Sequence, residues 1–104
     1  MSVYFVVTYD VSNPEEFAKY VPGSMPVILS TVAKHGGEIV VAGGEHVQVA
    51  GEERHVRVIM KFPNKEAVLA WDNDPEYAEA KAIREASTTN VTAFIVDQFT
   101  LPNS

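Results

Sequence analysis

The sequence predicts an α+β fold of the ferredoxin-like type, in which helices cover one face of an antiparallel sheet. Three observations support this prediction. The chain has 104 residues, which suits a single domain spanning 1–104. Hydrophobic residues make up 46% of it and charged residues 21%, a composition typical of globular proteins. The expected elements follow the order strand, helix, strand, strand, helix, strand, which is the βαββαβ order of this fold.

The first strand and the first helical part occupy the N-terminal section of the chain. Val3–Tyr9 is β-branched and aromatic throughout, as strands commonly are. Asn13 can cap a helix that has Pro14 at its first position. After an interruption at Pro22-Gly23, a second helical stretch is expected to end at His35-Gly36-Gly37, where a glycine can adopt the left-handed cap. The expected apolar face of this stretch consists of Met25, Ile28, Leu29 and Val32.

The middle of the chain is expected to be extended. Glu38–Ala42 has the composition of a second strand. Gly43-Gly44 then indicates a bulge or kink, and the alternating segment Glu45–Ala50 is expected to be extended as well. Arg54–Phe62 is the clearest strand in the sequence.

The C-terminal part predicts helix and then strand. Pro63-Asn64 opens a short helix that ends at Trp71. A further helix is expected to start at Asp74-Pro75, as cap and first residue, and to continue to about Ser87. Val91–Phe99 is the last expected strand.

The two faces of the predicted sheet differ in character. Right-handed crossovers would place the first and third strands together in the middle, with all helices on one side. Because strand residues alternate between faces, one uniformly apolar set is expected to meet the helices: Val3, Phe5, Val7, Tyr9, Val56, Val58, Met60 and Phe62. The other set mixes apolar with polar residues: Tyr4, Val6 and Ile59 with Thr8, Asp10, His55, Arg57 and Lys61.

This second face predicts a homodimer. Leaving roughly four or five apolar side chains in water would forfeit about 1.5–3 kcal/mol each, and no helices remain to cover them. A second copy packed against the open sheet face would form a two-chain α+β barrel. The polar residues of the face, Arg57 among them, would then lie at the rim or line an internal cavity.

Composition excludes several classes of partner. The net charge is −6, with 8 Lys+Arg scattered among 14 Asp+Glu, which argues against nucleic-acid binding. The chain has no cysteine, and no apolar run approaches the ~20 residues of a membrane span. No basic region precedes the first apolar residues, so a cytoplasmic protein without membrane contact is expected.

One segment resembles a known family. It runs Trp71-x-x-Asp74-Pro75-Glu76-Tyr77 and continues to Arg84, and Phe62-Pro63-Asn64-Lys65-Glu66 precedes it. With these motifs the chain resembles, over nearly its whole length, the small bacterial proteins of the domain of unknown function 1330 family. The resemblance implies the dimeric α+β barrel, a fold shared with small monooxygenases, isomerases and haem-degrading enzymes. The family has no established activity. Lys61 and Ala50-Gly51 depart from its pattern, so acid chemistry is not expected at those positions.

Arg84 and Asp10 are the candidate catalytic residues. Arg84 could hold an anionic small molecule with its planar guanidinium, or it could pair with a carboxylate such as Asp10 and tie helix to sheet. Asp10 ends the first strand, from which it could reach a cleft as a general base, or it could make a local turn bond.

Four more residues are candidates for substrate binding. Tyr77 lies two helical turns before Arg84 on nearly the same side of the helix. Trp71 is either a core residue or a platform for stacking. Tyr4 is either a hydrogen-bond donor inside the barrel or a half-buried aromatic residue whose hydroxyl is exposed to solvent. Arg57 completes the set. The three histidines show no metal-ligand spacing, so no metal or cofactor is expected.

These residues leave the function open between two main hypotheses. The first is a cofactor-independent enzyme, of isomerase or monooxygenase type, acting on small apolar or anionic substrates. The second is a non-catalytic small-molecule-binding or stress-associated dimer. A purely structural module without a pocket is a third. Motifs for phosphate loops, dinucleotides and the serine nucleophile elbow do not occur.

Overall fold

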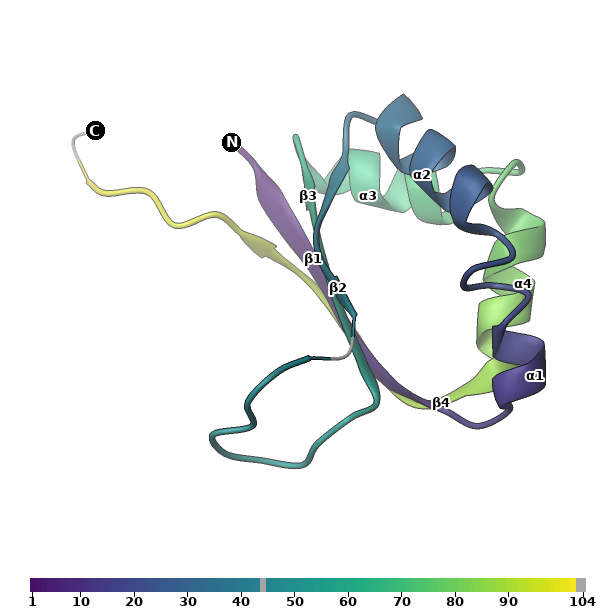
Figure 1. The fold of residues 1–104 in the computed structure, drawn as a ribbon. Coiled ribbons are helices and arrows are strands. Elements are labelled where there is room, and N and C mark those ends of the chain that lie inside the picture. The colour runs from purple at the N-terminus through teal and green to yellow at the C-terminus, as the bar shows by residue number, and fades with distance from the viewer. Residues whose placement is uncertain (44, 103–104) are drawn as a thin grey trace.

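The computed structural model describes residues 1–43 and 45–102 (Figure 1). The strands are β1 (Val3–Val11), β2 (Glu38–Gly43), β3 (Val56–Phe62) and β4 (Thr88–Asp97). The helices are α1 (Pro14–Phe17), α2 (Met25–Lys34), α3 (Lys65–Asp72) and α4 (Ala78–Ser87). The βαββαβ order is confirmed, with each helical part divided into two helices. Among the described residues, no helix is both long and apolar enough to cross a membrane.

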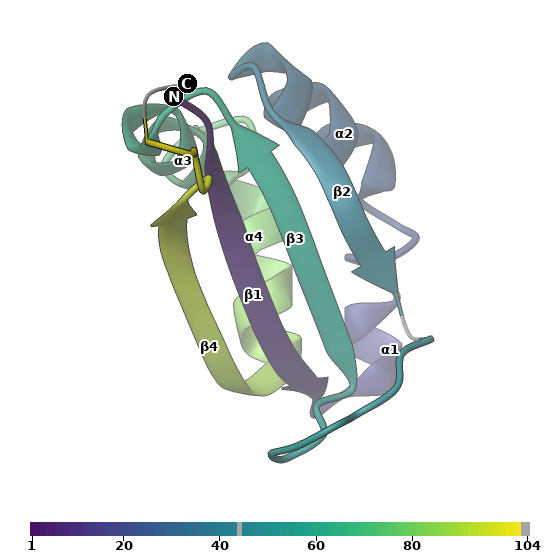
Figure 2. The ribbon, with the colours of Figure 1, turned by 90° about the vertical axis from the view of Figure 1, so that its left-hand side faces the viewer.

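The four strands form one antiparallel sheet in the order β2-β3-β1-β4. The predicted central position of the first and third strands is therefore confirmed. Val6 lies opposite Ile59 on β3 and opposite Phe94 on β4, so the three side chains share one face of the sheet. Figure 2 shows this face uncovered, with all four helices behind the sheet.

Two helices begin with asparagine caps, one at Asn13, as predicted, and one at Asn64, where the sequence predicted the opening of a short helix. The side chain of Asn13 accepts a hydrogen bond from the Glu16 amide at 3.1 Å, and that of Asn64 accepts one from the Ala67 amide at 2.8 Å. The helix predicted from Asp74-Pro75 begins instead at Ala78. Asp74 caps a turn that precedes the helix, where its Oδ1 accepts from the Glu76 amide at 2.8 Å.

The buried face of α2 differs from the prediction at one position. Leu29 was expected on the apolar face but is 51% exposed, whereas Thr31 is 1% exposed. Thr31 tolerates burial because its hydroxyl donates to the Val27 carbonyl at 2.7 Å and accepts from Trp71 Nε1 at 3.0 Å. The helix ends with Gly36 at a φ of 77°, which confirms the predicted left-handed glycine.

The strands also differ from the prediction in detail. The register of the β2–β3 pair shifts between Ile39 and Val41, where no bulge was predicted. The bulge or kink predicted at Gly43-Gly44 falls partly on Gly44, which lies outside the described residues. Gly43 does have a positive φ, of 139°. Glu45–Ala50 belongs to the connection between β2 and β3 and pairs with no described strand. The last strand begins at Thr88, earlier than expected.

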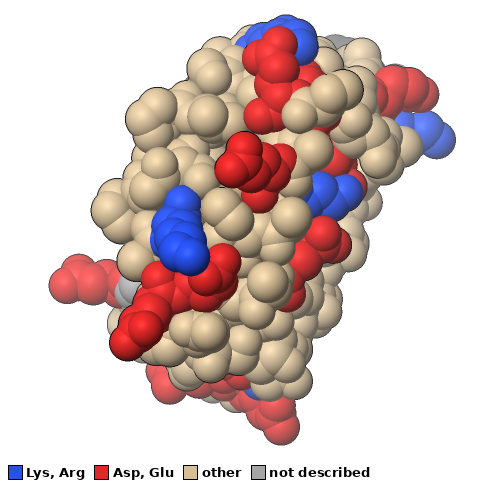
Figure 3. Space-filling view, turned by 90° about the vertical axis from the view of Figure 1, so that its right-hand side faces the viewer, with Lys and Arg blue, Asp and Glu red and all other residues tan. Residues whose placement is uncertain are grey.

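The core lies between the sheet and the helices. Its most deeply buried members are aromatic and aliphatic side chains from both layers: Phe62, Trp71, Tyr77, Val32 and Val68. Lys34 and His35 bind Asp74 at 2.9 and 2.7 Å, which fixes the end of α2 to the turn before α4. The outer side of the helices carries many acidic and fewer basic side chains (Figure 3), as a solvated surface does.

Candidate functional site

A cavity of about 390 Å³ lies between the sheet and the helices, in the size range of small-molecule sites. The helix-facing side chains of β1, β2 and β3 form one wall, and the helices with the turns that join them form the other. The lining residues are Phe5, Val7, Tyr9, Phe17, Tyr20, Val21, Met25, Ile28, Ile39, Ala42, Gly43, Val56, Val58, Met60, Trp71, Tyr77 and Arg84. The cavity is thus mainly apolar, with polar groups from three tyrosines, one tryptophan and one arginine.

Trp71 forms a rigid part of this wall. Its ring stacks on that of Tyr77, with 4.3 Å between centroids, and meets Phe5 edge-on at 6.2 Å. The indole N–H is already bonded to Thr31. Trp71 is therefore a core residue, as one of its two predicted roles requires, and its side chain also lines the cavity.

The hydroxyl oxygens of Tyr20 and Tyr77 lie 2.7 Å apart, and either group could be the donor. Both side chains are buried, with 5% and 0% exposed. Burial raises the pKa of Tyr20, and the neighbouring Tyr77 raises it further. Burial likewise raises the pKa of Tyr9 to about 12. These two phenols stay neutral at physiological pH and serve as hydrogen-bonding groups.

Arg84 is the cation of the cavity. Burial alone lowers the pKa of its guanidinium, but Tyr77, Tyr20 and the Asp72 carboxylate raise it more, so the side chain remains charged. Its Nε is buried and has no hydrogen-bond partner in the described part of the chain. Within those same residues, no carboxylate lies at salt-bridge distance from it. Asp72 is itself paired with Lys81 at 2.9 Å. Arg84 is thus a partly buried cation with a buried, unpartnered Nε and no carboxylate at salt-bridge distance among the described residues, an arrangement that suits an anionic ligand.

The structure brings together three of the six predicted site residues. Trp71, Tyr77 and Arg84 all line the cavity. Tyr4, Asp10 and Arg57 are not lining residues, since they belong to the alternate set of β1 and β3 that faces away from the helices.

Asp10 makes contacts outside the cavity instead. The Asp10 carboxylate accepts from Asn90 Nδ2 and from the His55 amide, both at 2.9 Å, and it lies 3.4 Å from Arg54. The bonds from Asn90 and His55 lower the pKa of Asp10. The pairing of Arg84 with Asp10, one of the two predicted roles for Arg84, is thus not found.

Sequence reasoning missed Tyr9 and Tyr20 as cavity residues. A signal for both was present, because Tyr9 belongs to the strand set expected to meet the helices and Tyr20 lies at helical spacing from the apolar Phe17. A buried tyrosine needs a hydrogen-bond partner, so such a position indicates a polar feature inside the core. The partner of Tyr20 is 57 residues away in sequence, and the pattern could not identify it.

Metal binding has no support among the described residues, which contain no group of three or more potential His, Asp or Glu ligands. Each histidine instead lies beside a single carboxylate. His35 meets Asp74 at 2.7 Å, His46 meets Glu53 at 3.4 Å and His55 meets Asp10 at 3.9 Å.

Comparison with known proteins defines the family and the fold. The family model described as "Domain of unknown function (DUF1330)" matches residues 2–99. No match was found among curated proteins.

Several solved structures share the fold at low sequence identity. A protein of unknown function from Rhodopseudomonas palustris is 19% identical, with a TM-score of 0.74 over 96% of this chain and 84% of that one. A dimeric ferredoxin-like protein of unknown function from Jannaschia sp. CCS1 is 16% identical, with a TM-score of 0.76 over 94% and 100% of the chains. A candidate antibiotic biosynthesis monooxygenase from Caulobacter crescentus CB15 is 14% identical, with a TM-score of 0.66 over 95% and 91%.

Proposed function

The chain belongs to the DUF1330 family, and we propose that it binds a small, mostly apolar organic anion in the cavity between its sheet and its helices. The observation that carries this proposal is the Arg84 guanidinium, whose buried Nε lacks a partner among the described residues. A ligand carboxylate would supply that partner and the missing negative charge. The apolar remainder of the lining suits a hydrocarbon or aromatic body.

Charge restricts the ligand to a single anionic group. Arg84 is the one ionised side chain among the described lining residues, so the cavity offers one site for one anion. A second carboxylate would have to lose its hydration against apolar walls, which is strongly unfavourable. We therefore infer a monoanion, with Trp71 and Tyr77 as the flat surface for its apolar part.

Binding is better supported than proton-transfer chemistry. An isomerase needs a base near the substrate, and the described lining contains no Asp, Glu or His. Asp10, the predicted base, is held on the other face of the sheet by Asn90, His55 and Arg54. The likeness in fold to the Caulobacter monooxygenase candidate supports a second possibility, a cofactor-independent oxygenase acting on a substrate that is already acidic.

Matched ligands test the proposal. Thermal unfolding would be followed with 2-naphthoate and with its neutral isostere 2-naphthamide, and Trp71, the single tryptophan, would report binding by fluorescence. We expect the carboxylate to raise the melting temperature and alter Trp71 emission, and the amide to do neither. Arg84→Met should weaken carboxylate binding roughly 10- to 100-fold, because a hydrogen bond to a charged group contributes about 1.5–3 kcal/mol.

Arg54→Met is the matched control, since it removes a guanidinium that lies outside the cavity. Equal stabilisation by the acid and the amide, or an unchanged response in Arg84→Met, would reject the anion site. Oxygen consumption with a carboxylate that binds would favour the oxygenase over the binder.

We also propose that a second copy covers the open sheet face. Phe94, Val96 and Val41 on this face are 49%, 46% and 40% exposed. Figure 2 shows no helix in front of the sheet on this side. Exposed apolar patches of this kind are typical of interfaces. Related folds described as dimeric give independent support. Sedimentation of wild type and of Phe94→Glu tests this, with a dimer expected for the first and a folded monomer for the second.

A further inference from the structure

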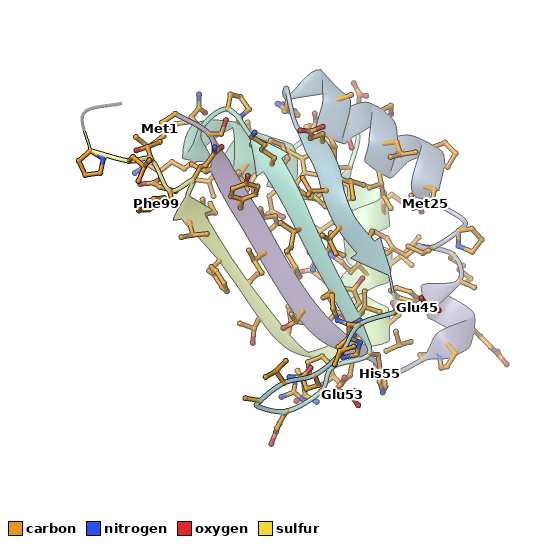
Figure 4. All side chains as sticks on the ribbon, turned by 60° about the vertical axis from the view of Figure 1, so that its left-hand side comes forward. Met1, Met25, Glu45, Glu53, His55 and Phe99 are labelled. Carbon is orange, nitrogen blue, oxygen red and sulfur yellow. The ribbon has the colours of Figure 1, made fainter. Side chains whose placement is uncertain are left out.

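The connection between β2 and β3 forms an arm that displays two valines. Residues 45–55, here the β2–β3 arm, project from the sheet on the side away from the helices (Figures 1 and 4). Val47 is 87% exposed and Val49 is 93% exposed, the two largest values among the exposed large hydrophobic residues. Their spacing of two puts both side chains on one side of an extended segment. An apolar strip of this kind is unfavourable in water unless a partner covers it.

Charged side chains fix the root of the β2–β3 arm. Arg57 donates to the Gly43 carbonyl at 3.3 Å and to the Arg54 carbonyl at 2.6 Å, which joins the two ends of the arm. Asp10 accepts from the His55 amide at 2.9 Å and lies 3.4 Å from the Arg54 guanidinium. The predicted site residues Asp10 and Arg57 thus both bind the root of this arm.

Polar contacts also organise the rest of the arm. His46 meets Glu53 across it at 3.4 Å. The Gln48 amide donates to the Ala50 carbonyl at 2.7 Å and to the Glu52 carbonyl at 3.4 Å. The polar residues therefore bond within the arm while the valines between them point outward. Preorganisation of this kind lowers the entropic cost of association.

A second apolar arm leaves the opposite end of the sheet. The C-terminal arm, residues 98–102, starts where the Gln98 amide donates to the Ser2 carbonyl at 2.9 Å. It carries Phe99 and Leu101, which are 78% and 66% exposed and again two residues apart. In Figure 1 it projects to the same side of the sheet as the β2–β3 arm, so the open face lies between the two.

We propose that the two arms clasp the second copy of the chain that packs on the open sheet face. This inference rests on the proposed sheet-to-sheet dimer and extends it to named segments outside the sheet. The four strands of the sheet span roughly 19 Å across, and the seven residues of β3 span roughly 23 Å along the strand. The product of these two lengths is the projected area of the open face. That is roughly half of the ~800 Å² that each partner contributes to a standard interface. The arms supply additional apolar surface, at both ends of the face.

The test is the dimer dissociation constant of full-length variants, measured by sedimentation equilibrium. We expect the double variant Val47→Ser with Val49→Ser, and separately Phe99→Ser with Leu101→Ser, to raise this constant at least tenfold. Leu29→Ser with Leu69→Ser is the matched control, because both leucines are 51% exposed but belong to helices on the other side of the sheet. The control should leave the constant unchanged. Circular dichroism and cooperative urea unfolding would establish that each variant is folded.

A spectroscopic measurement adds a direct readout. Since the chain has no cysteine, Val49→Cys provides a single site for a spin label. The label should be immobilised in the dimer and become mobile on dilution. If both arm variants have the wild-type dimer dissociation constant while Phe94→Glu is monomeric, the proposed role of the arms is wrong and the sheet-to-sheet dimer is retained. A wild-type monomer at tens of micromolar would overturn both, and neither result would bear on the anion site, which ligand titration tests separately.

Discussion

The hydroxyl oxygens of Tyr20 and Tyr77 lie 2.7 Å apart in an otherwise apolar cavity that also contains the Arg84 guanidinium. Tyr20 follows α1 and Tyr77 precedes α4, so the contact joins the two helical parts of the fold. The two hydroxyls can satisfy each other through this contact. The Nε of the neighbouring Arg84 guanidinium is left without a partner among the described residues, and the proposed ligand would supply one.

The phenol pair predicts a specific pattern of stability. Tyr20→Phe or Tyr77→Phe removes one hydroxyl and leaves the other buried without this partner, which should cost about 1–3 kcal/mol. Removing both should cost less than the sum of the single changes, with a coupling free energy of about 0.5–1.5 kcal/mol. Urea unfolding of the two single variants and the double variant measures this. Additive effects would contradict a direct bond between the two hydroxyls.

Thr31→Val tests the link between α2 and Trp71. Valine has nearly the same shape as threonine but cannot accept the hydrogen bond from Trp71 Nε1, so a buried N–H would be left unpaired. We expect a loss of about 1–3 kcal/mol in the free energy of unfolding. Ser30→Ala, at the neighbouring exposed position, should change it by less than ~0.5 kcal/mol. Similar losses in the two variants would show that the indole bond has no special role.

Asp74 predicts how stability depends on pH. Hydrogen bonds from His35, Lys34 and the Glu76 amide lower the pKa of Asp74 in the folded protein. A carboxylate with a depressed folded pKa contributes stability that is present above its unfolded pKa, about 3.9, and is lost as pH falls through the folded value. We therefore expect the urea midpoint of wild type to fall below about pH 4.

Asp74→Asn is the corresponding variant. It should be less stable than wild type at pH 7, and the difference should narrow as the solution is acidified towards pH 2. Glu76→Gln is the control, because the Glu76 side chain is 68% exposed and, in the described part of the chain, forms an ion pair only with Lys34. A constant difference between Asp74→Asn and wild type across this range would refute the assigned role of Asp74.

Local pattern was sufficient to predict the fold. Alternation along β1 and β3 separated the faces of the sheet, and the caps at Asn13 and Asn64 marked two helix starts. The local pattern failed where a side chain that is distant in sequence decides which residue of a helix is buried. Thr31 replaces Leu29 in the core because Trp71, 40 residues away, supplies a hydrogen bond. No periodicity within α2 contains that information.

The candidate site was also predicted only in part, because local spacing identifies some of its residues and contacts between distant segments bring in the others. The helical spacing of Tyr77 and Arg84 placed both in the cavity, as did the motif that includes Trp71. Alternation had already assigned Tyr4 and Asp10 to the open face, and the structure keeps them there. The phenol of Tyr20 reaches the cavity only through the packing of α1 and the following turn against α4, a contact between distant segments.

Asp10→Asn separates the role of Asp10 at the arm root from a role in catalysis. The neutral amide would weaken the contacts with Arg54 and the His55 amide, and the root of the β2–β3 arm would loosen. Because the arm is proposed to clasp a second copy, the dimer dissociation constant should rise severalfold and protease cleavage within residues 45–55 should accelerate. Carboxylate binding, followed by Trp71 fluorescence, should persist, since Asp10 is not a lining residue of the cavity. A general base would give the opposite pattern, in which turnover of a bound substrate is lost while dimer affinity and cleavage rate match those of wild type.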